Sequence, residues 1–262
     1  SRRELHLRGD RAAAARRRGA VLGGARDLHA VALVAVCGED ERIAHLTDIH
    51  VRTGVRPRRL HRAVELLHAL SPDLIALTGG LLSAMAAFGV DPTGRTCLDI
   101  GASTGGFTDC LLQHGARKVY AIDVGKGILH WKLRNDPRVV VMEETNARYV
   151  QSLPEPVSLV TVDASFISLK ILLPVIKKWN LVGGKTNEER GDMIALIKPQ
   201  FEAGKKDVAR GDGVIRDPEI HRQVLLDVLG FAQTEGFQIR GLIKSPLLGP
   251  KGNAEFLVWL GD

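Results

Sequence analysis

The stretch from Cys97 to Cys110, CLDIGASTGGFTDC, combines a carboxylate with a glycine-rich turn. An apolar run ends at Asp99, glycines follow at 101, 105 and 106, and an amphipathic helix is expected from residue 105 onward. Glycine lets the backbone approach a ligand closely, and a carboxylate accepts hydrogen bonds from hydroxyl or ammonium groups. These residues therefore predict a ligand-binding loop between a strand and a helix.

Three classes of ligand compete for such a loop. A nucleoside triphosphate requires G-x-x-x-x-G-K-[ST], but no lysine follows Gly106. A nicotinamide or flavin cofactor requires G-x-G-x-x-G, whereas Ser103 stands at the middle glycine position. S-adenosylmethionine has no phosphate and needs close backbone approach with nearby acceptors, so this spacing favours it. The loop residues expected to bind it are Gly101, Ser103, Thr104, Gly105 and Gly106.

Two aspartates supply the acceptors for that cofactor. Asp99 either accepts from the ammonium group or organises the loop. Asp123, 22 residues after Gly101 and at the end of the next apolar run, suits the two ribose hydroxyls. The alternative is that Asp123 caps the following helix and that the glycines only permit tight packing.

Short apolar runs separated by helical stretches continue from residue 95 to the end of the chain. Strands are expected at 96–100, 118–122, 138–142, 157–162 and 193–197, and helices at 105–114, 127–134, 168–179 and 218–235. Parallel strands need such crossovers, so the pattern predicts an α/β fold with a doubly wound, mostly parallel sheet of the Rossmann type. Two runs with no helix between them, 237–247 and 254–260, predict an antiparallel pair at the sheet edge.

The first 90 residues differ from the rest of the chain. Residues 1–30 hold eight arginines against three acidic residues and so carry +5 of the net charge of +6. They form either an arm that contacts nucleic-acid phosphates or a disordered segment. Residues 31–90 are expected to form strands at 31–38, 42–47 and 73–77 and a helix at 58–70. The turn at 91–94 predicts the boundary to a domain spanning 91–262.

The composition indicates a soluble, cytoplasmic protein without a membrane partner. Hydrophobic residues make up 45% of the chain, and no window approaches 18 uninterrupted apolar residues. The first residues lack the apolar segment of a secretory signal. The three cysteines form neither a disulfide framework nor a metal cluster, and we expect Cys97 and Cys110 to be small buried residues.

Several motifs, together with the Gly101 loop, carry a resemblance to a known family. The stretches VTVDASFISL, LIKPQFEAGK, GVIRDPEIH and SPLLGPKGNAEFLVWL resemble the TlyA haemolysin family of FtsJ-like S-adenosylmethionine-dependent methyltransferases, over about residues 84–262. The resemblance implies methylation of a ribose 2′-hydroxyl in ribosomal RNA, with that RNA or a ribosomal subunit as partner. It also implies a catalytic set of Asp163, Lys198 and Glu255, and it places Asn146 near the adenine side of the cofactor.

The implied catalytic set fits the chemistry, because a 2′-hydroxyl is a weak nucleophile. A cationic sulfonium and burial lower the pKa of a neighbouring lysine, and such a lysine can accept or steer the hydroxyl proton. We therefore expect Lys198 to activate or orient the hydroxyl, with Asp163 and Glu255 positioning it electrostatically. All three residues fall at or near strand ends, which converge on one rim of a doubly wound sheet.

The chain departs from the family at one catalytic position. The family has a further lysine where this chain has Leu82, and the helix around it is about two residues shorter here. Loss of that lysine is expected to reduce turnover on the order of 10²–10⁴-fold and to affect cofactor binding less. A non-catalytic cofactor- or RNA-binding protein is therefore the main alternative.

Residues 42–80 resemble a different family, the calcineurin-like metallophosphoesterases. Asp48 and His50 match the Asp-x-His pair that opens its two-metal site. Gly80 stands where a ligand aspartate belongs, and the later histidine ligands are missing. We therefore expect no metal site, and metallophosphoesterase activity is the least favoured alternative.

Overall fold

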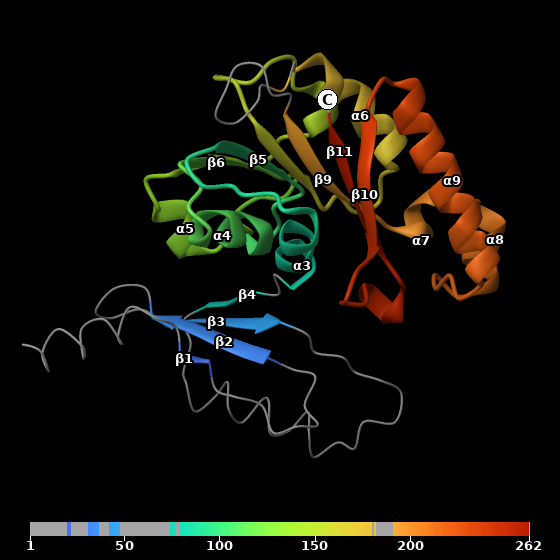
Figure 1. Cartoon of the computed structure of the whole chain (residues 1–262), viewed down its shortest axis with the longest axis horizontal. Helices are drawn as coiled ribbons and strands as arrows, with labels where there is room; N and C mark the ends of the chain where they lie inside the picture. The colour runs from blue at the N-terminus through green and yellow to red at the C-terminus, as the bar shows by residue number, and fades with distance from the viewer. Residues whose placement is uncertain are drawn as a thin grey trace, which may run out of the picture. The chain divides into compact units, whose positions relative to one another are not determined.

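The computed structural model describes four short strands before residue 79, and then residues 79–179, 181 and 191–261 (Figure 1). The chain divides into two compact units, residues 1–79 and 80–262. Apart from Ala20–Val21, the Arg-rich segment 1–30 lies outside the described residues. The same holds for the expected helix at 58–70 and for Asp48 and His50.

The first unit contains a small mixed sheet. Its strands are β1 (Ala20–Val21), β2 (Val31–Val36), β3 (Arg42–Thr47) and β4 (Leu74–Ala76), in the order β1-β2-β3-β4. The first two pairs are antiparallel, and β3 pairs with β4 in parallel. The three strands expected between residues 31 and 77 are thus present.

The second unit is built on a seven-stranded sheet in the order β10-β11-β9-β8-β5-β6-β7. The strands are β5 (Thr96–Ile100), β6 (Lys118–Ile122), β7 (Val139–Met142), β8 (Leu159–Val162), β9 (Asp192–Ile197), β10 (Gln238–Lys244) and β11 (Phe256–Gly261). The pairs from β9 to β7 are all parallel, whereas β11 runs antiparallel to both β9 and β10. The doubly wound sheet with an antiparallel edge is therefore confirmed.

Helices cover both faces of this sheet (Figure 1). They are α3 (Gly79–Phe88), α4 (Gly106–Gln113), α5 (Trp131–Asn135), α6 (Leu169–Lys178), α7 (Pro199–Glu202), α8 (Lys205–Arg210) and α9 (Pro218–Thr234), with short 3-10 turns η1 (Ala147–Tyr149) and η2 (Pro250–Gly252). One hydrophobic cluster joins the sheet to α3, α4 and α5, and the other joins it to α6 and α9. Alternate strand residues face the two clusters, because successive side chains of a strand point to opposite faces.

The boundary between the units lies earlier than the sequence indicated. A boundary at the turn 91–94 would leave helix α3 with residues 31–90. In the structure, residues from 80 onward belong to the second compact unit. Leu81, Ala84 and Met85 are buried in the same cluster as residues of α4. Their spacing of three and four residues forms one apolar face, which explains why α3 packs with the large sheet.

The structure confirms that the two cysteines of the second unit are small buried residues. Cys97 and Cys110 are free and buried, and burial raises the pKa of the Cys97 thiol to about 12, so neither is suited to thiolate chemistry.

Among the helices that the structure describes, none has the length and apolar character needed to cross a membrane.

Candidate active site

A cavity of about 640 Å³ opens where the strand order reverses, at the carboxyl ends of β5, β6 and β8. This switch point is where doubly wound sheets bind ligands. Five residues singled out from the sequence line the cavity: Gly101, Ser103, Asp123, Asn146 and Asp163. Neither Asp99 nor the Thr104, Gly105 and Gly106 group is part of the lining.

Gly101 brings the ends of β5 and β8 together. Its φ of 82° lies in the left-handed region, and a Cβ at this position would stand 2.6 Å from the carbonyl oxygen of Asp163. The backbone N–H of Asp163 in turn donates to the carbonyl of Ile100 at 2.9 Å. Close backbone approach therefore requires glycine here, and it sets the position of Asp163.

Replacing Gly101 by alanine should destabilise the second unit by about 2–4 kcal/mol, through the φ strain and the contact with Asp163. Gly94→Ala is the matched control, because Gly94 also has a positive φ, 73°, but open space around its Cβ position. That control should cost about 1–2 kcal/mol. Urea unfolding followed by tryptophan fluorescence measures both, since all three tryptophans lie in the second unit. Equal losses would show that the Asp163 contact is unimportant.

The second half of the glycine motif serves packing. Gly105 precedes α4 with a φ of 105°, and a Cβ there would overlap the side chain of Leu133 on α5. The carbonyl of Thr104 accepts from the backbone N–H of His130 at 3.1 Å. These contacts hold the start of α4 against the segment leading into α5, which matches the packing alternative for Gly105.

Asp99 lies beneath the loop and is fully buried. Its carboxylate accepts from the hydroxyls of Thr108, at 2.7 Å, and Thr161, at 3.0 Å. Desolvation raises the pKa of Asp99 to about 7, although both hydroxyls oppose the shift. Of the two roles open for Asp99, this geometry favours organising the loop over contacting a ligand.

Asp123 stands in the cavity wall at the end of β6. Its Oδ2 accepts from the backbone N–H of Ser103 at 2.8 Å, and its Oδ1 accepts from that of Gly125 at 2.8 Å. Each carboxylate oxygen can accept a second bond, so the group remains available to a ligand hydroxyl. The contact with Ser103 also links the β5 loop to the β6 end.

Asn146 lines the same cavity and follows β7 in the chain. Its side-chain oxygen accepts from the backbone N–H of Arg148 at 3.1 Å and caps the η1 turn. Asn146 therefore both caps this turn and forms part of the cavity wall.

Glu143, at the end of β7, was not singled out from the sequence. Its carboxylate accepts from the backbone N–H groups of Gly127, Ile128 and Leu129 at 2.7–2.9 Å and from Arg134 at 2.6 Å. These bonds, led by that from Arg134, lower the pKa of Glu143 to about 2. They hold residues 127–129 outside the helix, which explains why α5 begins at Trp131 rather than at 127 as expected.

The catalytic residues implied by the resemblance meet beside the cavity. The Nζ of Lys198, just after β9, is 2.6 Å from Oδ1 of Asp163, which follows β8. The same ammonium donates to the hydroxyl of Ser165 at 3.0 Å. Desolvation raises the pKa of Asp163, and Lys198 opposes that shift.

Glu255 joins this group through the antiparallel register of the sheet edge. Phe256, the first residue of β11, pairs with Ile197, the last residue of β9, so Glu255 lies next to Lys198 in the sheet. Its carboxylate is buried and accepts from Nε2 of Gln200 at 3.1 Å. Desolvation raises the pKa of Glu255, while Gln200 and the charge of Lys198 lower it.

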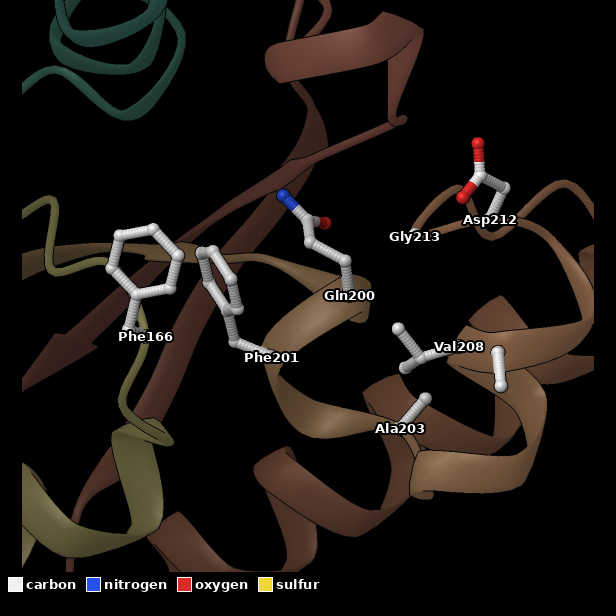
Figure 2. Close-up of a pocket in the computed structure, with 8 residues that line it drawn as sticks. Phe166, Gln200, Phe201, Ala203, Val208, Asp212 and Gly213 are labelled. Atoms are coloured by element: carbon white, nitrogen blue, oxygen red, sulfur yellow. The ribbon is translucent and has the colours of Figure 1, made fainter.

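A second hollow of about 500 Å³ is lined in part by Gln200, the residue that donates to Glu255 (Figure 2). Phe166 and Phe201 stand side by side at its edge, with ring centroids 5.1 Å apart and a tilt of 50°. Phe166 also lines the larger cavity, the residue is 90% exposed, and its φ of 63° is left-handed. An exposed aromatic ring between two hollows offers a flat surface to a planar ligand. The residue pattern carries no signal for such a surface, because the ring is identified only by its exposure in the folded chain.

Leu82 stands where the resemblance to the family implies a further lysine. Leu82 lies in the first part of α3 and packs, partly buried, against the hydrophobic cluster beneath that helix.

Within the described residues, the structure shows no group of three or more His, Cys, Asp or Glu side chains placed to hold a metal ion.

The fold has the architecture of a Rossmann-like methyltransferase, with a cavity at the switch point of the sheet and the Lys198–Asp163 pair beside it. The family model of FtsJ-like methyltransferases matches residues 80–262. The chain therefore belongs to the FtsJ-like methyltransferase family, and its relatives place it with the TlyA haemolysins.

Three relatives illustrate this placement. YqxC of Bacillus subtilis is 46% identical over 195 residues, 70% of this chain and 66% of YqxC. TlyA of Mycobacterium tuberculosis, named 16S/23S rRNA (cytidine-2′-O)-methyltransferase, is 48% identical over 182 residues, 69% of this chain and 65% of TlyA. A solved haemolysin structure from Lactococcus lactis superposes with a TM-score of 0.64 at 47% identity, covering 70% of this chain and 85% of that one.

The chain spans slightly less than two thirds of the length of the two curated relatives. The TlyA resemblance predicted from the sequence is confirmed. The family model begins at residue 80, so it lends no support to the metallophosphoesterase resemblance of residues 42–80.

Proposed function

We propose that this protein is an S-adenosylmethionine-dependent methyltransferase that acts on a ribose 2′-hydroxyl of ribosomal RNA. The observation that carries the proposal is the Lys198–Asp163 pair, with Glu255 next to Lys198, beside the cavity at the switch point. The name of the M. tuberculosis relative, a ribosomal RNA cytidine-2′-O-methyltransferase, supports the substrate class. A ribosomal subunit as partner and a cytoplasmic location belong to the same proposal.

The cavity suits the proposed cofactor. It has the volume of a small-molecule site, and the carboxylate of Asp123 stands in its wall, where it can accept from ribose hydroxyls. The backbone at Gly101 approaches without a side chain. When bound, S-adenosylmethionine would supply an electrophilic methyl group on a cationic sulfur.

The catalytic residues then divide the work on the RNA hydroxyl. Lys198, held by Asp163 and Ser165, donates a hydrogen bond to the 2′-oxygen and orients it toward the cavity. Desolvation makes Asp163 a stronger base than an ordinary carboxylate, so it can take the hydroxyl proton as the oxygen–carbon bond forms. Glu255 adds negative charge that keeps Lys198 in place.

The exposed ring of Phe166 suits the base of the nucleotide being modified. It lines both hollows and packs against Phe201, whose ring centroid is 5.9 Å from Nζ of Lys198. A base attached to a ribose at Lys198 would therefore reach this aromatic pair. Single-stranded bases commonly stack on such side chains.

Asp123→Ala should weaken S-adenosylmethionine binding by about 10–100-fold, because hydrogen bonds to a charged group contribute about 1.5–3 kcal/mol. Asp136→Ala is a matched control, since Asp136 also accepts from a backbone N–H two residues later, at 2.9 Å, but lies outside the cavity lining. Isothermal titration calorimetry gives both dissociation constants. A value within twofold of the unsubstituted protein for Asp123→Ala would contradict the ribose assignment.

The function itself is tested by methyl transfer. Ribosomal RNA from a strain lacking the corresponding gene is incubated with labelled S-adenosylmethionine and the protein. A 2′-O-methylated nucleotide should appear as a dinucleotide that resists alkaline hydrolysis, because the step requires a free 2′-hydroxyl. Label in base fragments, or none in RNA, would reject the proposal.

A non-catalytic cofactor- or RNA-binding protein is the second candidate, favoured by Leu82 at the position of the family lysine. Tight cofactor binding without transfer to any ribosomal RNA would support it. Absence of methyl transfer, of cofactor binding and of RNA binding would contradict both candidates.

A further inference from the structure

Helix α7 contacts one catalytic segment at both of its ends. We define the catalytic segment as residues 163–168, between β8 and α6. At the start of α7, the N-cap residue Lys198 meets Asp163 and Ser165. At its end, Glu202 accepts from the hydroxyl of Ser168 at 2.5 Å and from the backbone N–H of Leu169 at 2.7 Å. A single helical turn therefore holds the catalytic segment at two points.

The contact at Glu202 lies where the catalytic segment needs support. Phe166 adopts a left-handed φ of 63°, a strained conformation for an aromatic residue. Its exposed ring contributes little packing to hold that conformation. Such strain persists only where the surroundings fix the backbone, and Glu202 fixes it two residues further on.

Glu202 also completes the start of helix α6. Ser168 caps the helix by accepting from the backbone N–H of Lys170 at 3.2 Å, and Glu202 accepts from the preceding N–H, that of Leu169. A carboxylate at a helix N-terminus is favourable because it satisfies free N–H groups and meets the positive end of the dipole. Glu202 is half-buried, and this desolvation raises its pKa, while the bonds from Ser168 and Leu169 oppose the shift.

We propose that Glu202 is a positioning residue for methyl transfer, an inference that rests on the proposed function. By holding Ser168 and Leu169, it fixes the far end of the catalytic segment, so that Asp163 and Ser165 meet Lys198 in the productive geometry. Glu202 is part of the lining of neither the larger cavity nor the second hollow. It acts through the alignment of the Lys198 ammonium and the Phe166 ring.

The test measures geometry and turnover separately in the full chain. In Glu202→Ala, kcat for methyl transfer to ribosomal RNA should fall about 10–100-fold, as for misplacement of a reacting group by about 1 Å. The dissociation constant for S-adenosylmethionine should change less than threefold. Amide hydrogen exchange in peptides covering 163–170 should quicken at least tenfold, while peptides covering 101–108 keep their rate.

Three variants separate positioning from general damage. Glu202→Gln retains one acceptor oxygen and should recover most of the lost kcat. Ser168→Ala should lower kcat and combine with Glu202→Ala less than additively, since each removes the same contact. Glu219→Ala is the control, because Glu219 pairs with Arg222 in the first turn of α9 and should change neither kcat nor exchange.

Two results would overturn the inference. One is an unchanged rate of amide hydrogen exchange in the peptides covering 163–170 of Glu202→Ala. The other is a fall in kcat no larger than the fall in the fraction of protein that still binds S-adenosylmethionine. If the unsubstituted protein transfers no methyl group, the proposed function fails, while hydrogen exchange still decides whether Glu202 holds the catalytic segment.

Discussion

Lys198→Met should lower methyl transfer to ribosomal RNA by about 10²–10⁴-fold while leaving S-adenosylmethionine binding nearly unchanged. The magnitude is that of a group positioned to move or hold a proton in the transition state. Lys198 is the donor that Asp163 and Ser165 hold beside the cavity, and it does not line the cavity itself. Methionine keeps the length of the side chain and removes the charge. Single-turnover transfer of labelled methyl groups gives the rate.

This variant also separates catalysis from stability. Removing the ammonium leaves Asp163 without its cation, which should cost about 1–3 kcal/mol; the cost is reduced because the Asp163 side chain is one third exposed. The double variant Lys198→Met with Asp163→Asn should recover that stability and remain inactive. Lys177→Met, in the last turn of α6, is the control and should keep full activity. Activity returning with stability in the double variant would show that neither Lys198 nor Asp163 takes part in the reaction.

The fold of the second unit could be predicted because its signals are local. Each strand from β5 to β9 is a short apolar run, and each crossover helix has a recognisable apolar face, such as Leu169, Leu172, Leu173 and Ile176 on α6. Parallel pairing then follows from the connections. The boundary at α3 could not be predicted in this way, because the apolar face of a helix does not reveal which sheet it covers.

Candidate site residues on strand ends were also predictable, whereas their supports were not. Asp123 and Asp163 follow apolar runs, so the sheet brings them to one rim. The position of Glu255 beside Lys198 depends on the register of β11 against β9, which is set by long-range packing. Glu143 and Glu202 act through backbone N–H groups, and a sequence does not show which amides a distant carboxylate will meet.

The glycine-rich loop after β5 shows the same limit of prediction from sequence. The sequence favoured a cofactor role for Gly101 and Gly105 alike. In the structure Gly101 lines the cavity, but Gly105 makes room for Leu133. A glycine needed for packing and one needed for a ligand look the same in a sequence, because both are identified by the missing side chain.

Leu82→Lys should raise kcat at least about 10-fold if the missing ammonium limits turnover, within the range contributed by positioned acid–base groups. The start of α3 lies close to Ser245, which binds Glu255: the Cβ position of Gly80 is 3.7 Å from Oγ of Ser245, and the N–H of Ser245 donates to the carbonyl of Glu255 at 2.9 Å. A lysine at 82 can keep its methylenes against the hydrophobic cluster and extend its ammonium toward polar surroundings. Methyl-transfer rates at saturating cofactor and RNA measure the change.

Leu82→Met is the control for this prediction, because it changes the shape of the side chain without adding charge. It should leave kcat and cofactor binding unchanged. A similar gain in both variants would show that packing of α3, rather than charge, limits the reaction. No gain from lysine, with cofactor binding intact, would mean that Asp163, Lys198 and Glu255 orient the hydroxyl without a second ammonium.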